Sequence, residues 1–479
     1  MVTCPEVQVP VVGTRKRRRE SGVARASTKT ITDTRVTFQA GKLAASCTVV
    51  RAKIRGVVGF YSVASSLGTF VREEFSMKMR MQRVCVLSAC VAAVLLAACS
   101  RTETKAPSYE DQEAVAAHAN HSDSATFAAW DPKSAAAYLD QRESWWMSWE
   151  DAARDHGTFC VSCHTSAPYI VSRPTLRKAL AEEGPSANER LILADVSKRV
   201  RLWANIAPYY SDDDDGPNKA AESRATESVI NAFILASSDA QTGKLSEDTR
   251  VAFSNMWALQ LTEGRFKGAW LWQQFGSMPW ESRGSEYYGA TLAAIATGVA
   301  PEGYGNSADV QNNVKLLNEF LQQNSAAQSP MNRVDLLWAS TKLPGLLTAE
   351  QRNSIIDEIL AKQRPDGGWS MTSIALTWRN LDLESLFGGW KRDDGTPQEV
   401  QSDGLATGFI IFVFEEAGVS RQNDQVKRGL DWLASHQNKA DGSWTAYSLN
   451  KRRVSTSNVG RFMSDAATAF AVLALSNKH

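Results

Sequence analysis

The chain has no cysteine beyond Cys163, although it continues to residue 479. It is also poor in histidine there, because only His436 and His479 occur in residues 216–479. A cysteine nucleophile, a thioester and a zinc site with a cysteine ligand all need a thiol. These three kinds of chemistry are therefore excluded from the C-terminal part of the chain.

A strong charge of either sign is lacking too, since the formal net charge is +1 at pH 7. Such a balance indicates no nucleic acid or other polyanion as a partner of the whole molecule. Tryptophan is absent before Trp130, although the chain has 15 Trp residues. The first part of the chain therefore differs in composition from the rest, which has room for one large or two average domains.

The N-terminal part has no apolar run of comfortable membrane-spanning length, but a shorter run follows a basic start. Residues 77–83 are basic, and the apolar residues 84–98 follow them. The run ends in Leu96-Ala97-Ala98-Cys99, which resembles a bacterial lipobox, where the cysteine is lipidated and begins the mature protein. We expect a lipoprotein signal peptide over residues 77–98 and a lipid on Cys99. A plain signal peptide is the alternative.

Two further segments flank the predicted start of the mature chain. Residues 1–76 are interpreted as a spurious extension from an upstream start codon, and no function is predicted for them. The polar residues 99–125 are expected to be a flexible tether between the lipid and the folded body. The predicted location is the bacterial cell envelope, with the protein lipid-anchored and facing the periplasm or the exterior.

The last two cysteines belong to Cys160-Val161-Ser162-Cys163-His164, the Cys-x-x-Cys-His attachment pattern of a c-type haem. Thiols at this spacing reach one edge of a porphyrin and add to its two vinyl groups, and the adjacent imidazole binds the iron. We therefore predict one covalent haem c held by Cys160, Cys163 and His164. A zinc site is the alternative, with poor geometry because Cys163 and His164 are neighbours.

An electron-transfer haem usually has a second axial ligand, often Met or His. Met278 is the first candidate, because it lies in a predicted loop before an apolar helix. His156 is too close in sequence to His164 to reach the opposite face of the haem easily. Five other methionines compete with Met278 or pack in the core, namely Met147, Met256, Met331, Met371 and Met463.

The residues from 134 onward have the pattern of successive helices. One is predicted over 134–156 and ended by Gly157; Pro174 is predicted to open a second, which runs to residue 183; a third covers 187–206. These segments lie in residues 126–215, which we interpret as a helical haem-binding region.

Residues 216–479 alternate between two kinds of predicted helix. The apolar ones start roughly 50 to 70 residues apart, a repeat period. Helices apolar all round should be buried, and amphipathic ones should lie outside. The pattern predicts an all-α fold, either an α/α toroid of inner and outer helices or an open solenoid. Apolar helices are expected at 226–237, 287–297, 334–342, 405–417 and 465–475, and amphipathic ones at 247–261, 310–323, 349–362 and 424–436.

A motif recurs at the ends of the amphipathic helices. Its full form is Arg428-Gly429-x-x-Trp432-Leu433-x3-Gln437-x4-Gly442-x-Trp444, with a shorter form at residues 363–369 and a stretched one at 260–270. It matches the repeat motif of the squalene–hopene and oxidosqualene cyclase family, so this part of the chain resembles that family's α/α toroid. The resemblance implies that Gln and Trp tie the end of an outer helix to the loop after it. Glycine permits a tight turn there, and Trp covers apolar surface.

A cyclase also needs a buried carboxyl group, kept neutral in an apolar cavity, to protonate an alkene. The family's Asp-x-Asp-Asp motif has a formal match at residues 212–215, but four like charges there indicate a solvated loop. The zinc site of the prenyltransferase relatives lacks its cysteine. The catalytic candidates are Glu286, Asp403 and Asp465. Together with Glu227 and Asp335 they lie near the starts of the predicted apolar helices. The alternative role for all five is to cap these helices.

Together these patterns predict an exported lipoprotein with one haem c on a squalene-cyclase-like toroid. The expected activity is electron transfer or haem-dependent redox chemistry. Two alternatives remain, a terpene or squalene cyclase-like enzyme and a haem-containing binding protein. The implied partners are a redox protein, a hydrophobic small molecule in the toroid cavity and, through the lipid anchor, the membrane.

Overall fold

The computed structural model describes residues 34–40, 43–54, 57–63, 130–376 and 390–476. The chain divides into two compact units, Met1–His121 and Ser122–His479. In the first unit three antiparallel strands pair in the order β1-β2-β3. The strands are β1 (Thr34–Ala40), β2 (Leu43–Ile54) and β3 (Val57–Val63). The predicted signal peptide, Cys99 and the predicted tether lie outside the described residues.

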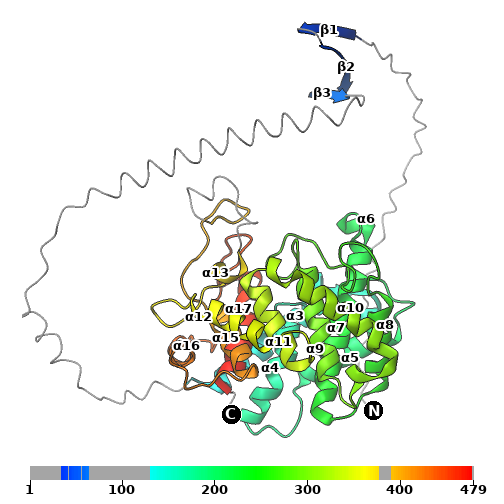
Figure 1. The fold of residues 1–479 in the computed structure, drawn as a ribbon. Helices are drawn as coiled ribbons and strands as arrows, with labels where there is room; N and C mark the ends of the chain where they lie inside the picture. The colour runs from blue at the N-terminus through cyan, green and yellow to red at the C-terminus, as the bar shows by residue number, and fades with distance from the viewer. Residues whose placement is uncertain (1–33, 41–42, 55–56, 64–129, 377–389, 477–479) are drawn as a thin grey trace, which may run out of the picture. The chain divides into compact units, whose positions relative to one another are not determined.

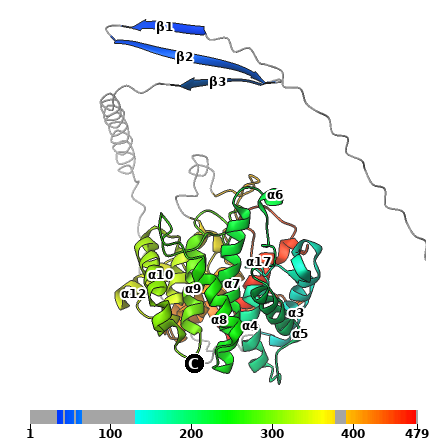
Figure 2. The ribbon, with the colours of Figure 1, turned by 90° about the vertical axis from the view of Figure 1, so that its right-hand side faces the viewer.

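The described part of the second unit is built mainly of α-helices, which confirms the all-α class in this coarse form (Figures 1 and 2). Its strands, over residues 130–376 and 390–476, are β4 (Ala153–Arg154) and β5 (Thr158–Phe159), which form a two-residue antiparallel ladder. Short 3-10 helices lie at Glu150–Ala152, Asp155–Gly157, Tyr304–Asn306, Ala308–Val310, Ser325–Ala327 and Val459–Arg461.

Six helices pack on one another in succession. α4 packs on α7, α7 on α9, α9 on α11, α11 on α15, α15 on α17, and α17 on α4. In α15 every residue except Glu416 is buried, as expected for a helix that is apolar all round. These helices are α4 (Ser166–Ala179), α7 (Lys219–Thr242), α9 (Glu286–Val299), α11 (Pro330–Lys342), α15 (Gly404–Glu416) and α17 (Phe462–Ser476).

A second set of helices, hereafter the outer helices, covers the first set, hereafter the inner helices. α3 packs on α4 and α17, α5 and α8 on α7, α10 on α9, α12 on α11, and α16 on α15 and α17. In α16 only Val426, Gly429, Trp432 and Leu433 are buried, which is the single apolar stripe of an amphipathic helix. The set comprises α3 (Pro132–Ser148), α5 (Ala187–Arg201), α8 (Glu247–Ala258), α10 (Gln311–Asn324), α12 (Ala349–Leu360) and α16 (Asp424–Ser435); α6 (Asp212–Asp215) and α13 (Met371–Ala375) are short.

The three tryptophans of the repeat motif make the same contact. Each indole is fully buried, and its N–H donates to a backbone carbonyl in the preceding outer helix. The tie that the motif predicts is therefore present in all three repeats. The bonds are Trp270 to Met256 (2.6 Å), Trp369 to Ile359 (2.8 Å) and Trp444 to Leu433 (2.8 Å).

The three glutamines of the motif also act alike. Each side-chain amide donates to the carbonyl of the motif glycine and to a backbone carbonyl at the start of the next outer helix. One tie thus joins α8 to α10, one α12 to α16, and one α16 to α3. The acceptors are Gly268 and Asn313 for Gln260, Gly367 and Gln425 for Gln363, and Gly442 and Asp131 for Gln437.

Several predicted helix limits are wrong. α7 spans Lys219–Thr242, whereas the sequence predicted only 226–237. The other clear differences lie before residue 216. The first helix ends at Ser148 and not at residue 156, and the third ends at Arg201 and not at 206. Pro174 lies inside α4, which begins at Ser166. Pro168 occupies the first turn instead, where a missing backbone N–H costs nothing because that N–H has no partner within the helix.

The expected boundary between residues 215 and 216 lies inside the second compact unit. α4, which follows the Cys-x-x-Cys-His motif, packs between α7 and α17.

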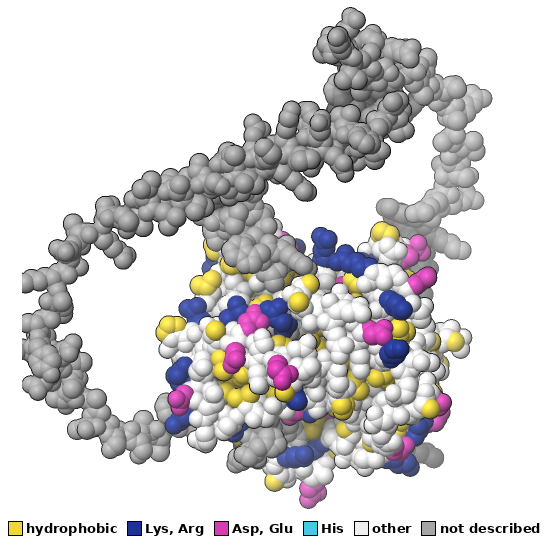
Figure 3. Space-filling view, viewed as in Figure 1, with side chains coloured by type: hydrophobic (Ala, Val, Ile, Leu, Met, Phe, Trp, Pro, Cys, Tyr) yellow, Lys and Arg dark blue, Asp and Glu magenta, His cyan; other side chains and the backbone are white. Residues whose placement is uncertain are grey.

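Among the described helices, Val459–Ser476 is long and apolar enough to cross a membrane, but 56% of that stretch is buried inside the protein, as in a core helix. On the face shown in Figure 3, basic and acidic side chains are interspersed, in keeping with the small net charge.

Candidate haem-binding site

The Cys-x-x-Cys-His motif lies between the β4–β5 ladder and α4. The backbone N–H of Cys160 donates to the carbonyl of Ala152 at 2.8 Å, which attaches the start of the motif to the 3-10 helix that precedes β4. The Ser162 hydroxyl accepts the N–H groups of Thr165 and Ser166, both at 3.1 Å. Ser162 therefore holds the turn that carries Cys163 and His164 into the helix.

Both thiols of the motif are buried and form no disulfide. Cys160 is 9% exposed and Cys163 is 5% exposed. Burial raises the pKa of the Cys160 thiol to about 12 and raises that of Cys163 as well. Both thiols are therefore neutral at pH 7 in the folded chain.

The imidazole of His164 is held between two aromatic side chains. Phe462 stacks on it with ring centres 3.9 Å apart, and the edge of Trp146 meets it at 5.0 Å. Burial, with smaller contributions from the positive charges of Arg142 and Arg453, lowers the pKa of His164 to about 3. The ring is therefore neutral at pH 7, which is the form that binds a metal ion.

His164 and Cys163 line a cavity of about 350 Å³, hereafter the haem cavity. Its walls combine aromatic rings with two guanidinium groups, those of Arg154 and Arg453. A haem needs apolar walls, an imidazole and positive charge near its two propionates, and the cavity offers all three. Asp151 and Glu281 line it as well, whereas Cys160 is not among the lining residues. The aromatic lining residues are Trp146, Trp149, Tyr210, Trp280 and Phe462.

Met278 lines the same cavity, although it lies far along the chain from the motif. Its backbone N–H donates to the Asn450 side chain at 2.8 Å, and the Asn450 amide donates to the Met278 carbonyl at 3.0 Å. Of the five competing methionines only Met463 lines the haem cavity. His156 is not among the lining residues; its ring is 44% exposed and pairs with Asp155 at 2.9 Å.

No three side chains of His, Cys, Asp or Glu converge as a metal site in the described part of the chain. That finding bears on a bare metal ion, which needs three or four protein ligands. A haem iron is held by its porphyrin and needs only one or two, so a single histidine with a methionine suffices.

Four of the five acidic residues at the apolar helices have structural partners, and for Glu286 this is a long hydrogen bond from the Gln274 amide, at 3.4 Å. Glu227 forms a fully buried ion pair with Arg199 at 2.6 Å. Asp403 caps α15 by accepting the N–H groups of Leu405 and Ala406. Asp465 accepts hydrogen bonds from Arg142, Tyr138 and Thr165.

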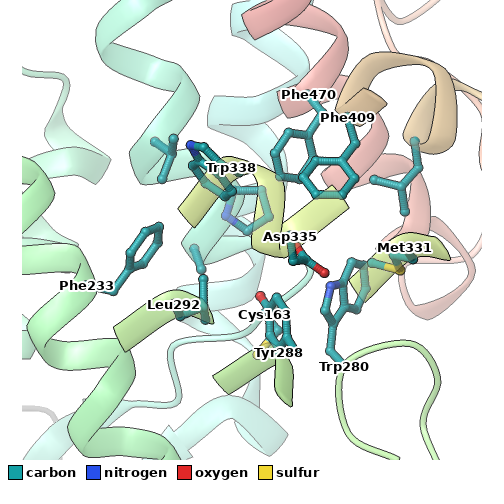
Figure 4. A pocket seen from close by; sticks show the side chains of 14 residues that line it. Cys163, Phe233, Trp280, Tyr288, Leu292, Met331, Asp335, Trp338, Phe409 and Phe470 are labelled. Carbon is teal, nitrogen blue, oxygen red and sulfur yellow. The ribbon is translucent and has the colours of Figure 1, made fainter. Parts of the chain in front are cut away.

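Glu286 and Asp335 line cavities. Glu286 borders a cavity of about 760 Å³ that also has Met278 and Arg283 in its wall, and burial raises its pKa. Asp335 borders a cavity among the inner helices, where it lies near Cys163, Tyr288 and Trp280 (Figure 4). Burial raises the pKa of Asp335, and its Oδ2 has no hydrogen-bond partner among the described residues.

The cavity beside Asp335 is small. Its volume is about 30 Å³, and aromatic and aliphatic side chains such as Trp338, Phe409 and Phe470 surround it (Figure 4). A buried water needs roughly 10 to 15 Å³ of such space, so about two waters fit.

The run of aspartates at 212–215 is exposed, as predicted, and forms one helical turn, α6.

Some residues of the site have no sequence signal. Arg154 and Arg453 are charged residues in polar stretches and look like ordinary surface residues. Thr165 directly follows the haem motif, and this position is its only sequence signal.

No family model matches this chain, and no curated protein matches it either.

Proposed function

We propose that this protein is an exported electron-transfer lipoprotein with one haem c in the haem cavity. The observation that carries the proposal is that Cys163, His164 and Met278 line one cavity. The first two come from the attachment motif, and Met278 comes from a separate loop. When bound, the haem takes up and releases a single electron.

The residues around the haem cavity have separate tasks in this proposal. Neutral His164 would offer a ring nitrogen to the iron, and the thioether of Met278 would be the second ligand. Arg154 and Arg453 offer positive charge to the haem propionates. The aromatic walls exclude water from the haem, which favours electron transfer over reaction with solvent species.

We further propose that the second unit is an α/α toroid of the squalene-cyclase kind. The succession of packed helices from α4 through α17 and back to α4 supports this arrangement. The Gln and Trp ties in three repeats support it as well. In this proposal α3 and α4 belong to the toroid, which extends it beyond the residues expected from the sequence.

A cyclase and a binding protein for a hydrophobic molecule are the alternative functions. Both need a large apolar cavity among the inner helices. The cavity beside Asp335 has a volume of about 30 Å³, far too small for a polyisoprenoid chain. The cavity beside Glu286 is larger, about 760 Å³, but charged and polar side chains such as Arg265 and Arg283 line it. Neither cavity is the large apolar enclosure that both alternatives need, and this favours the redox proposal. A redox partner protein and a lipid anchor on Cys99 remain part of that proposal.

Carbon monoxide binding tests whether the haem has a protein ligand on both faces. Electron transfer predicts that the reduced wild-type protein does not bind carbon monoxide, because Met278 would already bind the iron on the face opposite His164. Met278→Leu conserves volume but removes the sulfur, so it should bind carbon monoxide. Met463→Leu is the matched control and should behave as the wild type does. Immediate binding by the wild type would instead favour a haem that binds or transforms a small molecule.

A further inference from the structure

The hydroxyl of Thr165 bridges the imidazole of His164 and a buried carboxylate. Its Oγ1 lies 2.8 Å from His164 Nδ1 and 2.8 Å from Asp465 Oδ2. Thr165 directly follows His164, whereas Asp465 lies on α17, 300 positions away in sequence. The fold therefore brings a carboxylate to the back of the imidazole through one intervening hydroxyl.

The charge on Asp465 fixes the direction of these hydrogen bonds. Arg142 binds both carboxylate oxygens, with Nε 2.7 Å from Oδ1 and Nη2 3.0 Å from Oδ2. Burial raises the pKa of Asp465, and the Arg142 guanidinium, with the hydrogen bonds from Thr165 and Tyr138, opposes that rise. A carboxylate bound at both oxygens by a guanidinium is held in its ionised form, which can only accept hydrogen bonds. Thr165 must therefore donate its single hydroxyl proton to Asp465.

That direction determines the tautomer of His164. Once Thr165 has donated its proton to Asp465, its oxygen can only accept toward the ring. Nδ1 must then carry the ring proton. A metal ion binds the neutral ring, and in the neutral ring with a proton on Nδ1 the free lone pair is on Nε2.

The surroundings hold the three residues in place. Tyr138 also donates to Asp465 at 2.9 Å, and Arg142 donates to the carbonyl of Asn458 at 2.8 Å. Phe462, near the start of α17, stacks on His164. Helices α3 and α17 therefore fix both the position of the carboxylate and the plane of the ring.

We propose that Thr165 and Asp465 are positioning residues that keep His164 as the Nδ1–H tautomer and strengthen Nε2 as a ligand of the haem iron. This inference rests on the proposed haem function. A carboxylate behind a metal-bound histidine makes the imidazole a stronger electron donor. A stronger donor stabilises oxidised iron more than reduced iron, and so lowers the reduction potential.

The test compares two substitutions at residue 165 in the haem-loaded full chain. Thr165→Val keeps the shape of the side chain but removes the hydroxyl, so the midpoint potential should rise. In the Met278→Leu background, which leaves the reduced iron five-coordinate, the iron–histidine stretching frequency should fall. Thr165→Ser keeps the hydroxyl and should leave both values as in the wild type. Thr297→Val is a control for the loss of a buried hydroxyl elsewhere, since the Thr297 hydroxyl donates to the carbonyl of Ala293 within α9.

An unchanged potential and stretching frequency in Thr165→Val, with the full haem content, would overturn the proposal. If Thr165→Val fails to fold, Thr165→Ala gives the same comparison. If the wild type carries no haem, the proposed function fails, and nitrogen-15 NMR of that same chain still tests the tautomer. His164 should then show a protonated Nδ1 and a bare Nε2, and the opposite tautomer would contradict the relay.

Discussion

The side chain of Gln437 forms two hydrogen bonds with the backbone of Asp131, 306 positions earlier in the chain. Its Oε1 accepts the Asp131 N–H at 2.6 Å, and its Nε2 donates to the Asp131 carbonyl at 2.9 Å. Asp131 is the cap residue at the start of α3. Gln437 therefore joins the last outer helix, α16, to the first.

Replacing Gln437 should weaken the whole second unit. Gln437→Ala removes both bonds to Asp131 and a third to Gly442. At about 1 kcal/mol for each net hydrogen bond, we expect a loss of about 3 kcal/mol in the free energy of unfolding. Urea unfolding measures it, with the exposed Gln422→Ala as control. Equal stabilities of the two variants would mean that the tie does not hold the two ends together.

The motif glycine should tolerate no side chain. A Cβ on Gly442 would lie 2.3 Å from the backbone carbon of Ser134 in α3, and its φ is +79°. Gly418 has a similar φ of +85°, but a Cβ there meets nothing within 4 Å. Gly418→Ala should cost about 1 kcal/mol through backbone strain alone. Gly442→Ala should cost about 3 kcal/mol or more, because α3 must also move.

A similar loss of stability in both glycine variants would contradict close packing of this loop against α3. Thermal unfolding of the two proteins under one set of conditions provides the comparison. Gly442 is the more informative site, since the same loop also supplies the carbonyl that Gln437 binds.

Stability should depend on pH through Glu143, which is fully buried in α3. Burial raises its pKa to about 8 from the ordinary value of 4.5. Between these values the folded chain holds a proton that the unfolded chain has released. Stability contributed by Glu143 is therefore complete below about pH 4.5 and falls as pH rises to about 8, by at most about 1.4 kcal/mol per pH unit.

Glu143→Gln removes this titration and keeps an oxygen to accept the Ser166 hydroxyl. The variant should gain stability relative to the wild type as pH rises from 5 to 8. Urea unfolding at several pH values gives both curves, and the exposed Glu150→Gln should follow the wild type. Parallel curves for Glu143→Gln and the wild type would show that Glu143 does not hold a proton in the folded chain.

The helix pattern beyond residue 216 was predictable because it depends on local sequence. Apolar helices such as α15 and amphipathic ones such as α16 differ in composition and in the periodicity of their apolar residues, and both can be read from local sequence. The limits of the helices near the haem motif were harder to predict. Pro174 is a strong helix-start signal, but Pro168 six positions earlier satisfies the same preference, and tertiary packing on α17 decides between them.

The candidate site was predictable only in its local part. Cys160, Cys163 and His164 are adjacent in sequence, so their spacing carries the signal. The sequence alone does not distinguish Met278 from the other candidate methionines, and its position in the wall of the haem cavity follows only from the fold. The contact of Thr165 with Asp465 spans 300 positions, and one sequence holds no information on such a pairing.

The most direct measurement is a reduced pyridine-haemochrome spectrum of the denatured protein. The full chain would be exported in a bacterium with a cytochrome c maturation apparatus, beside a Cys160→Ala, Cys163→Ala double variant. One covalent haem per wild-type chain is expected, with the spectrum of a haem joined by two thioether bonds, and none after denaturation of the double variant. Wild-type protein without covalent haem would contradict the proposed function.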